Sequence, residues 1–213
     1  MTEFWDIKFK DQKTTWGFEP SDSAIFTRDF FLANQVKDIL IPGIGYGRNA
    51  KIFHDNGIKV TGIEISKSAI DMAKEENGLD LNIYHGSVTD MPFDNKSYDG
   101  IFCYALIHLL NKQERKKFIQ NCYNQLSPNG YMIFTVVSKK ASMFGNGKQL
   151  SSDRYELMKG LKVFFYDSKT VRQEFKDYGL IDFKELDEPI KHMDNEPPLK
   201  CILVKCRKKD SID

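Results

Sequence analysis

Three closely spaced glycines are the part of this 213-residue sequence best suited to bind a ligand. Gly43, Gly45 and Gly47 follow the apolar run DILIP, and the residues after them predict a helix. Where a strand ends in glycines and a helix begins, the backbone can approach a ligand closely and direct unpaired amide N–H groups at it. The spacing departs from the GxGxxG pattern of dinucleotide-binding proteins, because Arg48 stands where the third glycine would be. This departure argues against a nicotinamide cofactor.

A carboxylate stands at the end of the next apolar run. Glu64 comes roughly 20 residues after the glycine loop, where an acidic side chain can accept hydrogen bonds from adjacent ribose hydroxyls. The pair therefore suits any nucleoside ligand. Two alternatives stay open, because a glutamate after a strand can be an ordinary surface residue and glycine loops without ligands exist.

The segment after the third predicted strand carries a resemblance to a known family. Residues 87–110, SVTDMPFDNKSYDGIFCYALIHLL, resemble the middle motifs of class I S-adenosylmethionine (SAM) dependent methyltransferases. Residues 5–24, 39–50 and 60–70 resemble the thiopurine, thiol and halide methyltransferase branch and the tellurite-resistance methyltransferases. In those relatives an N-terminal aromatic segment closes over the cofactor, which makes Trp16, and with it Trp5, candidate lid residues. The resemblance implies SAM as the cofactor and S-adenosylhomocysteine (SAH) as the product.

The resemblance also assigns roles to individual residues. Asp90 is expected to meet the adenine amino group, Met91 to flank the adenine ring, and residues 103–105 to lie beside the methionine part. Many class I enzymes have an acidic residue at the position of Ile41, so backbone carbonyls near Gly43 are expected to hold the methionine ammonium group here. The residues expected to bind the cofactor are Trp16, Pro42, Gly43, Ile44, Gly45, Tyr46, Gly47, Arg48, Glu64, Ile65, Ser66, Val88, Thr89, Asp90, Met91, Cys103, Tyr104 and Ala105.

Few residues in the sequence offer acid–base chemistry. A thiolate, halide or tellurite acceptor is already a competent nucleophile, whereas a hydroxyl or amine can need a general base. His108, after the fourth predicted strand, is a candidate base, and Tyr104 is a candidate for cation–π contact with a sulfonium; core packing is the alternative for both. Cys103 lies in an apolar strand without a cationic neighbour, which predicts an inert thiol.

In an open α/β sheet the acceptor enters through the crevice beyond the carboxyl ends of the strands. Two segments are expected to border it, a polar, glycine-bearing insertion over residues 138–160 and a connection over residues 188–199. Solvated loop residues are the alternative interpretation. The candidate acceptor contacts are Phe144, Arg154, Tyr155 and His192.

Strands alternate with helices along the whole chain, and this alternation predicts a parallel, doubly wound sheet. With the resemblance, we expect a single α/β domain over residues 1–213 with a Rossmann-like, mostly parallel seven-stranded sheet whose last strand is antiparallel. Residues 1–33 are expected to form a lid and a helix. Strands are predicted at 38–42, 58–65, 81–86, 98–105, 131–137, 180–186 and 200–206, and helices at 24–34, 46–56, 66–77, 111–126 and 168–178.

Charge and composition narrow the classes of partner. Lys and Arg total 31 against 30 Asp and Glu, so no strong field favours nucleic acid. No run approaches the roughly 20 apolar residues that cross a bilayer, and we expect a cytoplasmic protein without a membrane partner. The four cysteines and four histidines show no metal-ligand spacing, so no metal is expected.

These features together predict a methyltransferase for a small-molecule acceptor, such as a thiol, a halide or a metalloid oxyanion. The chain is expected to be a monomer or weak dimer. A non-catalytic SAM- or nucleotide-binding regulatory domain is the alternative, and an NAD-dependent oxidoreductase is disfavoured by Arg48.

Overall fold

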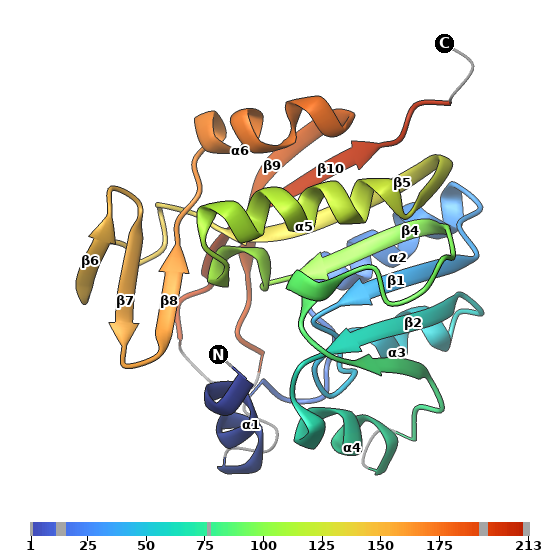
Figure 1. Ribbon diagram of the computed structural model, residues 1–213, viewed down its shortest axis with the longest axis horizontal. Helices are drawn as coiled ribbons and strands as arrows, with labels where there is room; N and C mark the ends of the chain where they lie inside the picture. The colour runs from blue at the N-terminus through green and yellow to red at the C-terminus, as the bar shows by residue number, and fades with distance from the viewer. Residues whose placement is uncertain (1, 12–15, 76–77, 192–195, 211–213) are drawn as a thin grey trace.

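The computed structural model describes residues 2–11, 16–75, 78–191 and 196–210. Its centre is a seven-stranded sheet with the strand order β3-β2-β1-β4-β5-β10-β9 (Figure 1). β1 to β5 run parallel to one another, and β10 is antiparallel to both β5 and β9. The predicted fold class is therefore confirmed. The strands are β1 Asp38–Pro42, β2 Lys59–Glu64, β3 Asn82–His85, β4 Tyr98–Tyr104, β5 Leu126–Val137, β9 Leu180–Glu188 and β10 Leu199–Arg207.

Helices cover both faces of this sheet. One core cluster includes Phe118 of α5 and Phe175 of α6, and a second includes Phe31 of α2 and Phe53 of α3. Both clusters include residues of the central strands, so the sheet is buried on two sides, as a parallel sheet requires. The helices are α1 Thr2–Asp11, α2 Asp22–Ala33, α3 Ala50–His54, α4 Lys67–Glu75, α5 Lys112–Asn124 and α6 Ser168–Phe175, with short 3₁₀ turns η1 Val88–Asp90, η2 Ile107–Leu109 and η3 Lys176–Tyr178.

Side-chain caps fix where the longer helices begin. The Ser21 hydroxyl accepts the Ala24 amide of α2, and the Asp167 carboxylate accepts the Thr170 amide of α6. At α5, Asn111 and Glu114 form a reciprocal capping box. Each cap satisfies amides that the helix cannot pair itself.

The helix after the glycine loop starts later than predicted. α3 begins at Ala50 instead of near Tyr46. Gly43, Gly45 and Gly47 have φ angles of 70°, 58° and 80°, a left-handed conformation that interrupts a right-handed helix. The backbone therefore makes turns through residues 43–49.

The insertion over residues 138–160 is more regular than predicted. Together with the residues after it, it forms a separate antiparallel sheet of β6 Lys148–Ser151, β7 Arg154–Met158 and β8 Leu161–Phe164. Phe144, Tyr155 and Phe165 pack edge to face beneath it, with ring centroids 5.3 to 6.0 Å apart. Figure 1 shows both this sheet and α1 lying beyond the carboxyl ends of β1, β2 and β4.

Within the described ranges, no helix is both long enough and apolar enough to span a membrane.

Candidate functional site

The glycine loop and the second strand are joined by hydrogen bonds at the carboxyl edge of the sheet. The amides of Gly43 and Ile44 donate to the Ile63 carbonyl at 2.8 and 3.1 Å. The Gly45 amide donates to Oε2 of Glu64 at 2.8 Å. The predicted loop and the predicted carboxylate therefore meet in space, which their separation in sequence alone does not establish.

Glu64 is buried, with 6% of its surface exposed. Its Oε1 accepts the amides of Ile65 and Ser66, both at 2.9 Å. Burial raises the pKa of the Glu64 carboxyl, and the three amide hydrogen bonds oppose that shift. The carboxylate is thus positioned by the backbone, with lone pairs left for further donors such as ligand hydroxyls.

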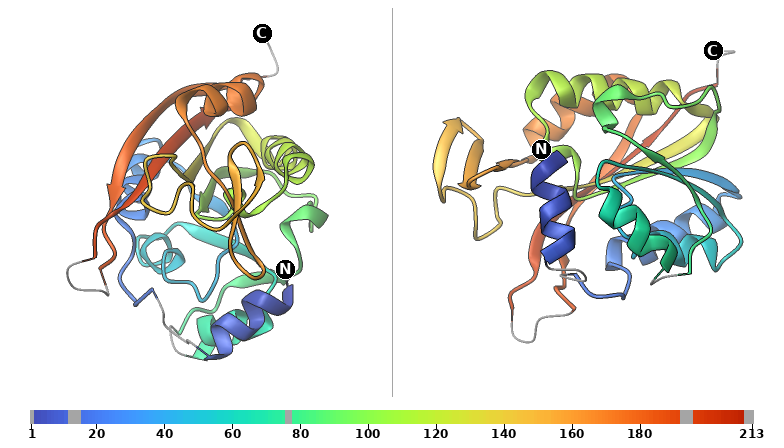
Figure 2. Two further views of the ribbon diagram at one scale, coloured as in Figure 1. Left: turned by 90° about the vertical axis from the view of Figure 1, so that its left-hand side faces the viewer. Right: turned by 60° about the horizontal axis from the view of Figure 1, so that its bottom comes forward.

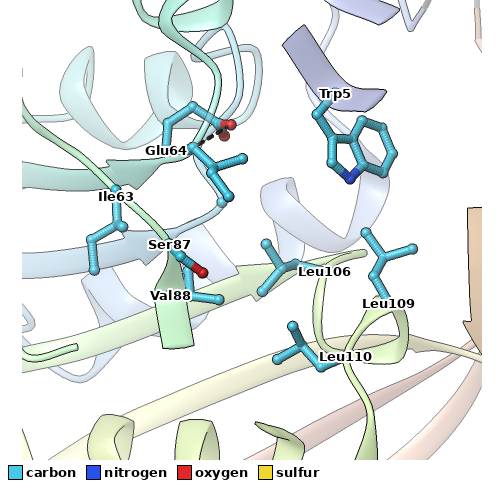
Figure 3. Close-up of a pocket in the computed structure, with 11 residues that line it drawn as sticks. Trp5, Ile63, Glu64, Ser87, Val88, Leu106, Leu109 and Leu110 are labelled. Carbon is cyan, nitrogen blue, oxygen red and sulfur yellow. Dashed lines mark hydrogen bonds between the residues drawn. The ribbon is translucent and has the colours of Figure 1, made fainter. Parts of the chain in front are cut away.

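A pocket opens beside Glu64 (Figure 3). Its walls are mainly apolar, with the Glu64 carboxylate and the Ser87 hydroxyl as its polar side chains. An apolar slot with one carboxylate at its edge suits a nucleoside, whose ring is flat and whose sugar carries adjacent hydroxyls. The lining residues are Trp5, Gly43, Ile63, Glu64, Ile65, Gly86, Ser87, Val88, Leu106, Leu109 and Leu110.

The segment after β3 places the predicted adenine contacts in different surroundings. Asp90 is exposed and lies outside the pocket lining, and Met91 is 3% exposed within the main core. Gly86 and Ser87, which follow β3 directly, line the pocket instead. A serine carries no charge to mark it as a ligand contact, so sequence reasoning passed over Ser87. Its position immediately after a parallel strand was the available signal.

The chain leaving β4 closes over the glycine loop. A Cβ built on Gly43 would lie 2.3 Å from Cδ1 of Leu106, so only glycine fits there without movement. Ala105 has a φ of 51°, an uncommon conformation for a residue other than glycine. Such strain collects at functional sites, and here it turns Leu106 into the pocket.

Cys103 and Tyr104 have different environments. Cys103 is fully buried, and burial raises the pKa of its thiol to about 12, as expected for an inert residue. Tyr104 is half-buried, and its ring centroid lies 5.6 Å from Cζ of Arg48. Burial raises the pKa of the Tyr104 phenol, which therefore stays protonated at neutral pH.

The N-terminal segment is docked over the site. Phe9 and Tyr46 are buried in one cluster, against which Trp5 and Trp16 pack. The Tyr46 hydroxyl donates to the Gly17 carbonyl at 2.5 Å, and Nη1 of Arg48 donates to the Trp16 carbonyl at 2.9 Å. Trp5 also lines the pocket (Figure 3), whereas Trp16 packs against this cluster without lining the pocket.

Asp6 holds α1 against the start of α4. Its Oδ1 accepts the Ser66 hydroxyl at 3.0 Å and the Ser68 amide at 3.2 Å. Lys10, with Nζ 2.8 Å from the second carboxylate oxygen, and these hydrogen bonds lower the Asp6 pKa. Ser66, predicted as a cofactor contact, thus donates one of the hydrogen bonds that join α1 to α4.

His108 is buried in η2 and does not line the pocket. Its Nδ1 has no hydrogen-bond partner among the described residues. Burial lowers the pKa of His108 to about 3, so the imidazole is neutral at physiological pH. A base of that strength is poorly matched to proton abstraction near pH 7.

The candidate acceptor contacts separate into two groups. Phe144 and Tyr155 pack within the aromatic cluster under the insertion sheet, outside the pocket lining. Arg154 is also outside the pocket lining, but its Nη2 donates to the carbonyl of the lining residue Leu109 at 3.2 Å. His192 lies outside the described residues.

The other predicted cofactor residues surround the same loop. Pro42 ends β1 and is buried, as are Ile44 and Tyr46. The Thr89 hydroxyl lies 2.8 Å from that of Ser87. A Cβ built on Gly47 would lie 2.6 Å from Cδ1 of Leu79. Across the part of the chain that the structure describes, no group of three or more metal-ligating side chains is found.

Comparison with known proteins gives concordant results. Residues 40–134 match the family model described as a methyltransferase domain. The ubiquinone biosynthesis O-methyltransferase of Coxiella burnetii is 28% identical over 106 residues, 48% of this chain and 44% of the relative. The tRNA N(3)-methylcytidine methyltransferase Mettl2 of Drosophila melanogaster is 23% identical over 172 residues, 75% of this chain and 51% of that protein. The chain thus spans about half or less of the length of these relatives.

A solved structure of similar fold covers nearly the whole chain. The 1,6-didemethyltoxoflavin-N1-methyltransferase of Burkholderia thailandensis, solved with 1,6-didemethyltoxoflavin and SAH, superposes with a TM-score of 0.74. It is 15% identical and covers 98% of this chain and 87% of its own. This likeness places the fold among those of Rossmann-like SAM methyltransferases.

Proposed function

We propose that this chain, whose residues 40–134 match a methyltransferase domain, is a SAM-dependent methyltransferase that acts on a small-molecule acceptor. The observation that carries the proposal is the position of Glu64, buried at the pocket wall and bonded to the Gly45 amide. That arrangement joins a glycine loop to a carboxylate suited to ribose hydroxyls.

The residues present fit an adenosyl group. The pocket walls supply apolar surface from Ile63, Val88 and Leu110 for a base, and a carboxylate and a hydroxyl for polar contacts. Glu64 would hold the ribose, Ser87 and Val88 would border the adenine, and the turn at Gly43 would face the methionine part. SAM supplies an electrophilic methyl group on a sulfonium when it is bound.

The chain's own contribution is alignment and exclusion of water. Trp5 and Leu106 border the pocket and limit access of solvent, which favours direct displacement over side reactions. Neither His108 nor Tyr104 is a matched base, because burial lowers the pKa of the histidine and raises that of the phenol. This supports an acceptor that is already nucleophilic.

A thiolate, a halide or a metalloid oxyanion is therefore the favoured acceptor class. This choice agrees with the sequence resemblance to thiopurine, thiol, halide and tellurite-resistance methyltransferases. The acceptor of the toxoflavin-pathway enzyme and that of the tRNA enzyme differ from each other, so the matches alone do not choose between acceptor classes. A non-catalytic domain that binds SAM for regulation is the second candidate, because His108, the predicted general base, has a lowered pKa and does not line the pocket.

Calorimetric titration with SAM and SAH tests the cofactor assignment. We expect both to bind, and absence of binding at millimolar concentration would end the proposal. Formation of SAH from SAM is then measured with a panel of thiols, halides and oxyanions. Turnover of any acceptor identifies the enzyme, whereas tight SAM binding without turnover across the panel favours the regulatory domain.

A further inference from the structure

Arg154 occupies an unusual electrostatic position at the wall of the pocket. It lies on β7, is partly buried, and donates from Nη2 to the carbonyl of the pocket residue Leu109 at 3.2 Å. Its Nε is buried and has no hydrogen-bond partner within the described ranges. The Arg154 guanidinium can therefore donate further hydrogen bonds, and one of its donors, Nε, is shielded from water.

Three carboxylates near Arg154 in the sequence or in space form their hydrogen bonds and ion pairs with other groups, although the charge of Glu114 still acts on the Arg154 guanidinium. Asp153 pairs with Lys139 at 2.9 Å, and Glu156 accepts the Gly160 amide at 3.1 Å. Glu114 accepts the Asn111 amide at 2.6 Å in the α5 capping box. The described residues thus supply Arg154 with no ion pair.

Arg115 lies in the same region, and each of its three guanidinium nitrogens has a hydrogen-bond partner. It is 3% exposed, and its Nε and Nη2 hold the Glu174 carboxylate at 2.7 to 3.1 Å. Its Nη1 donates to the Leu110 carbonyl, next to the carbonyl that Arg154 uses. The two arginines flank η2 in similar ways, but among the described side chains only Arg115 has a carboxylate in direct ion-pair contact.

A half-buried cation that no carboxylate contacts directly is costly, since burial removes hydration that one carbonyl hydrogen bond replaces only in part. Burial, and next the positive charge of Arg115, lowers the pKa of Arg154, and the negative charge of Glu114 opposes that shift; the guanidinium stays charged at neutral pH. An anion bound beside Leu109 would remove this cost.

We propose that Arg154 binds an oxyanion group, a carboxylate or a phosphate, carried by an organic methyl acceptor, which within the favoured acceptor class is a thiol. The planar guanidinium matches both groups through paired hydrogen bonds. The site adjoins the pocket at Leu109 and lies across from α1, whose Phe4 packs within 3.2 Å of a Cβ built on Gly160 in the β7–β8 turn. Figure 2 shows α1 and the β6–β8 sheet on the same side of the molecule. Arg154 would then anchor the acceptor away from its methylated atom. The inference rests on the proposed function for the identity of the ligand as an acceptor.

Titration of the full chain, saturated with SAH, with benzoate, phenyl phosphate and uncharged benzamide tests the site at constant ionic strength. We expect benzoate or phenyl phosphate to bind about tenfold or more tightly than benzamide, because a charge-assisted hydrogen bond separates them. The anion that binds more tightly identifies the carboxylate or the phosphate class. Equal affinity for all three probes would overturn the inference.

Two variants assign the binding to the guanidinium. Arg154→Met should lose about tenfold or more of the anion affinity, and Lys162→Met, which removes an exposed lysine on β8, should leave it unchanged. Unchanged SAH affinity shows that a variant is folded. If Arg154→Met fails that control, Arg154→Gln, which still has a donor for the Leu109 carbonyl, takes its place. Anion binding that survives the substitution contradicts the inference.

The same titrations without SAH separate the two proposals. Arg154-dependent anion binding by a protein that does not bind SAH would overturn the methyltransferase assignment and keep the anion site. SAH binding with Arg154-independent anion binding would overturn the anion site alone.

Discussion

Gly45 donates its amide to Oε2 of Glu64 at 2.8 Å, and this bond ties the turn after β1 to the end of β2. The two residues are 19 positions apart in the chain. Because β1 and β2 are parallel neighbours with Pro42 opposite Ile63, their carboxyl ends lie at the same edge. A nucleoside at this edge would meet the loop and the carboxylate together.

Substitution of Glu64 tests that arrangement. Glu64→Ala should weaken SAM binding by about 1–3 kcal/mol through the loss of hydrogen bonds to a charged acceptor. Glu64→Gln keeps the shape and should lose less. Calorimetry measures both, with Glu75→Gln on the exposed side of α4 as the control. If both Glu64 variants bound SAM as tightly as the wild type, the cofactor site would lie elsewhere.

Gly43 should tolerate no side chain, for two separable reasons. Its φ of 70° strains any other residue, and an added Cβ would meet Leu106 at 2.3 Å. Gly57 has a similar φ of 76° but nothing within 4 Å of such a Cβ. Gly57→Ala therefore reports the backbone strain alone, expected at about 1 kcal/mol or slightly more.

The Gly43→Ala variant should lose more unfolding free energy than Gly57→Ala and should also bind SAM less tightly. Chemical denaturation and calorimetry measure the two effects. Equal destabilisation by the two substitutions would mean that Leu106 moves aside at no cost.

The sequence predicted the parts of the fold that depend on local pattern. The apolar runs before Gly43 and Ser66 became β1 and β2, and Asn111 became the cap of α5. The glycine loop and Glu64 were found because their residue types are specific for close approach and for hydroxyl binding.

The rest of the fold and of the candidate site depends on tertiary contacts, which a single sequence does not show. The insertion sheet escaped prediction because β6 is exposed at every position and carries no apolar alternation. The charge of Asp90 makes it the sequence candidate for the adenine contact, whereas the position of Ser87 at the pocket depends on how the chain turns at η1. The sequence predicts a loop at Arg154, whereas the structure places it on β7 without a direct ion pair to any described carboxylate, which no sequence pattern indicates.

Release of α1 should weaken cofactor retention if the helix acts as a lid. Asp6→Asn replaces the carboxylate that holds Ser66, Ser68 and Lys10. We expect faster amide hydrogen exchange in α1 and faster SAM dissociation in stopped-flow fluorescence of Trp5 and Trp16. Asp71→Asn, which breaks the exposed pair with Lys67 on α4, is the matched control. Faster exchange without faster dissociation would show that α1 is docked but does not gate the pocket.

His108 should make the protein less stable in mild acid. Its pKa is lowered from 6.5 to about 3 by burial, so between these values the unfolded chain binds a proton that the folded chain does not. The stability that His108 contributes is therefore present above pH 6.5 and is lost progressively as the pH falls toward 3. From pH 7 to pH 5 the expected loss in unfolding free energy is about 2 kcal/mol.

His108→Leu should remove that part of the pH dependence, since leucine does not titrate and also removes the unpartnered Nδ1 from the interior. His54→Leu, at an exposed position of α3, should leave the slope as in the wild type. Urea denaturation at pH 5, 6 and 7 gives the slope of unfolding free energy against pH for the wild type and for each variant. If the His108→Leu and wild-type slopes coincide, His108 is already accessible to protons in the folded state. It would then again be a candidate general base for methyl transfer.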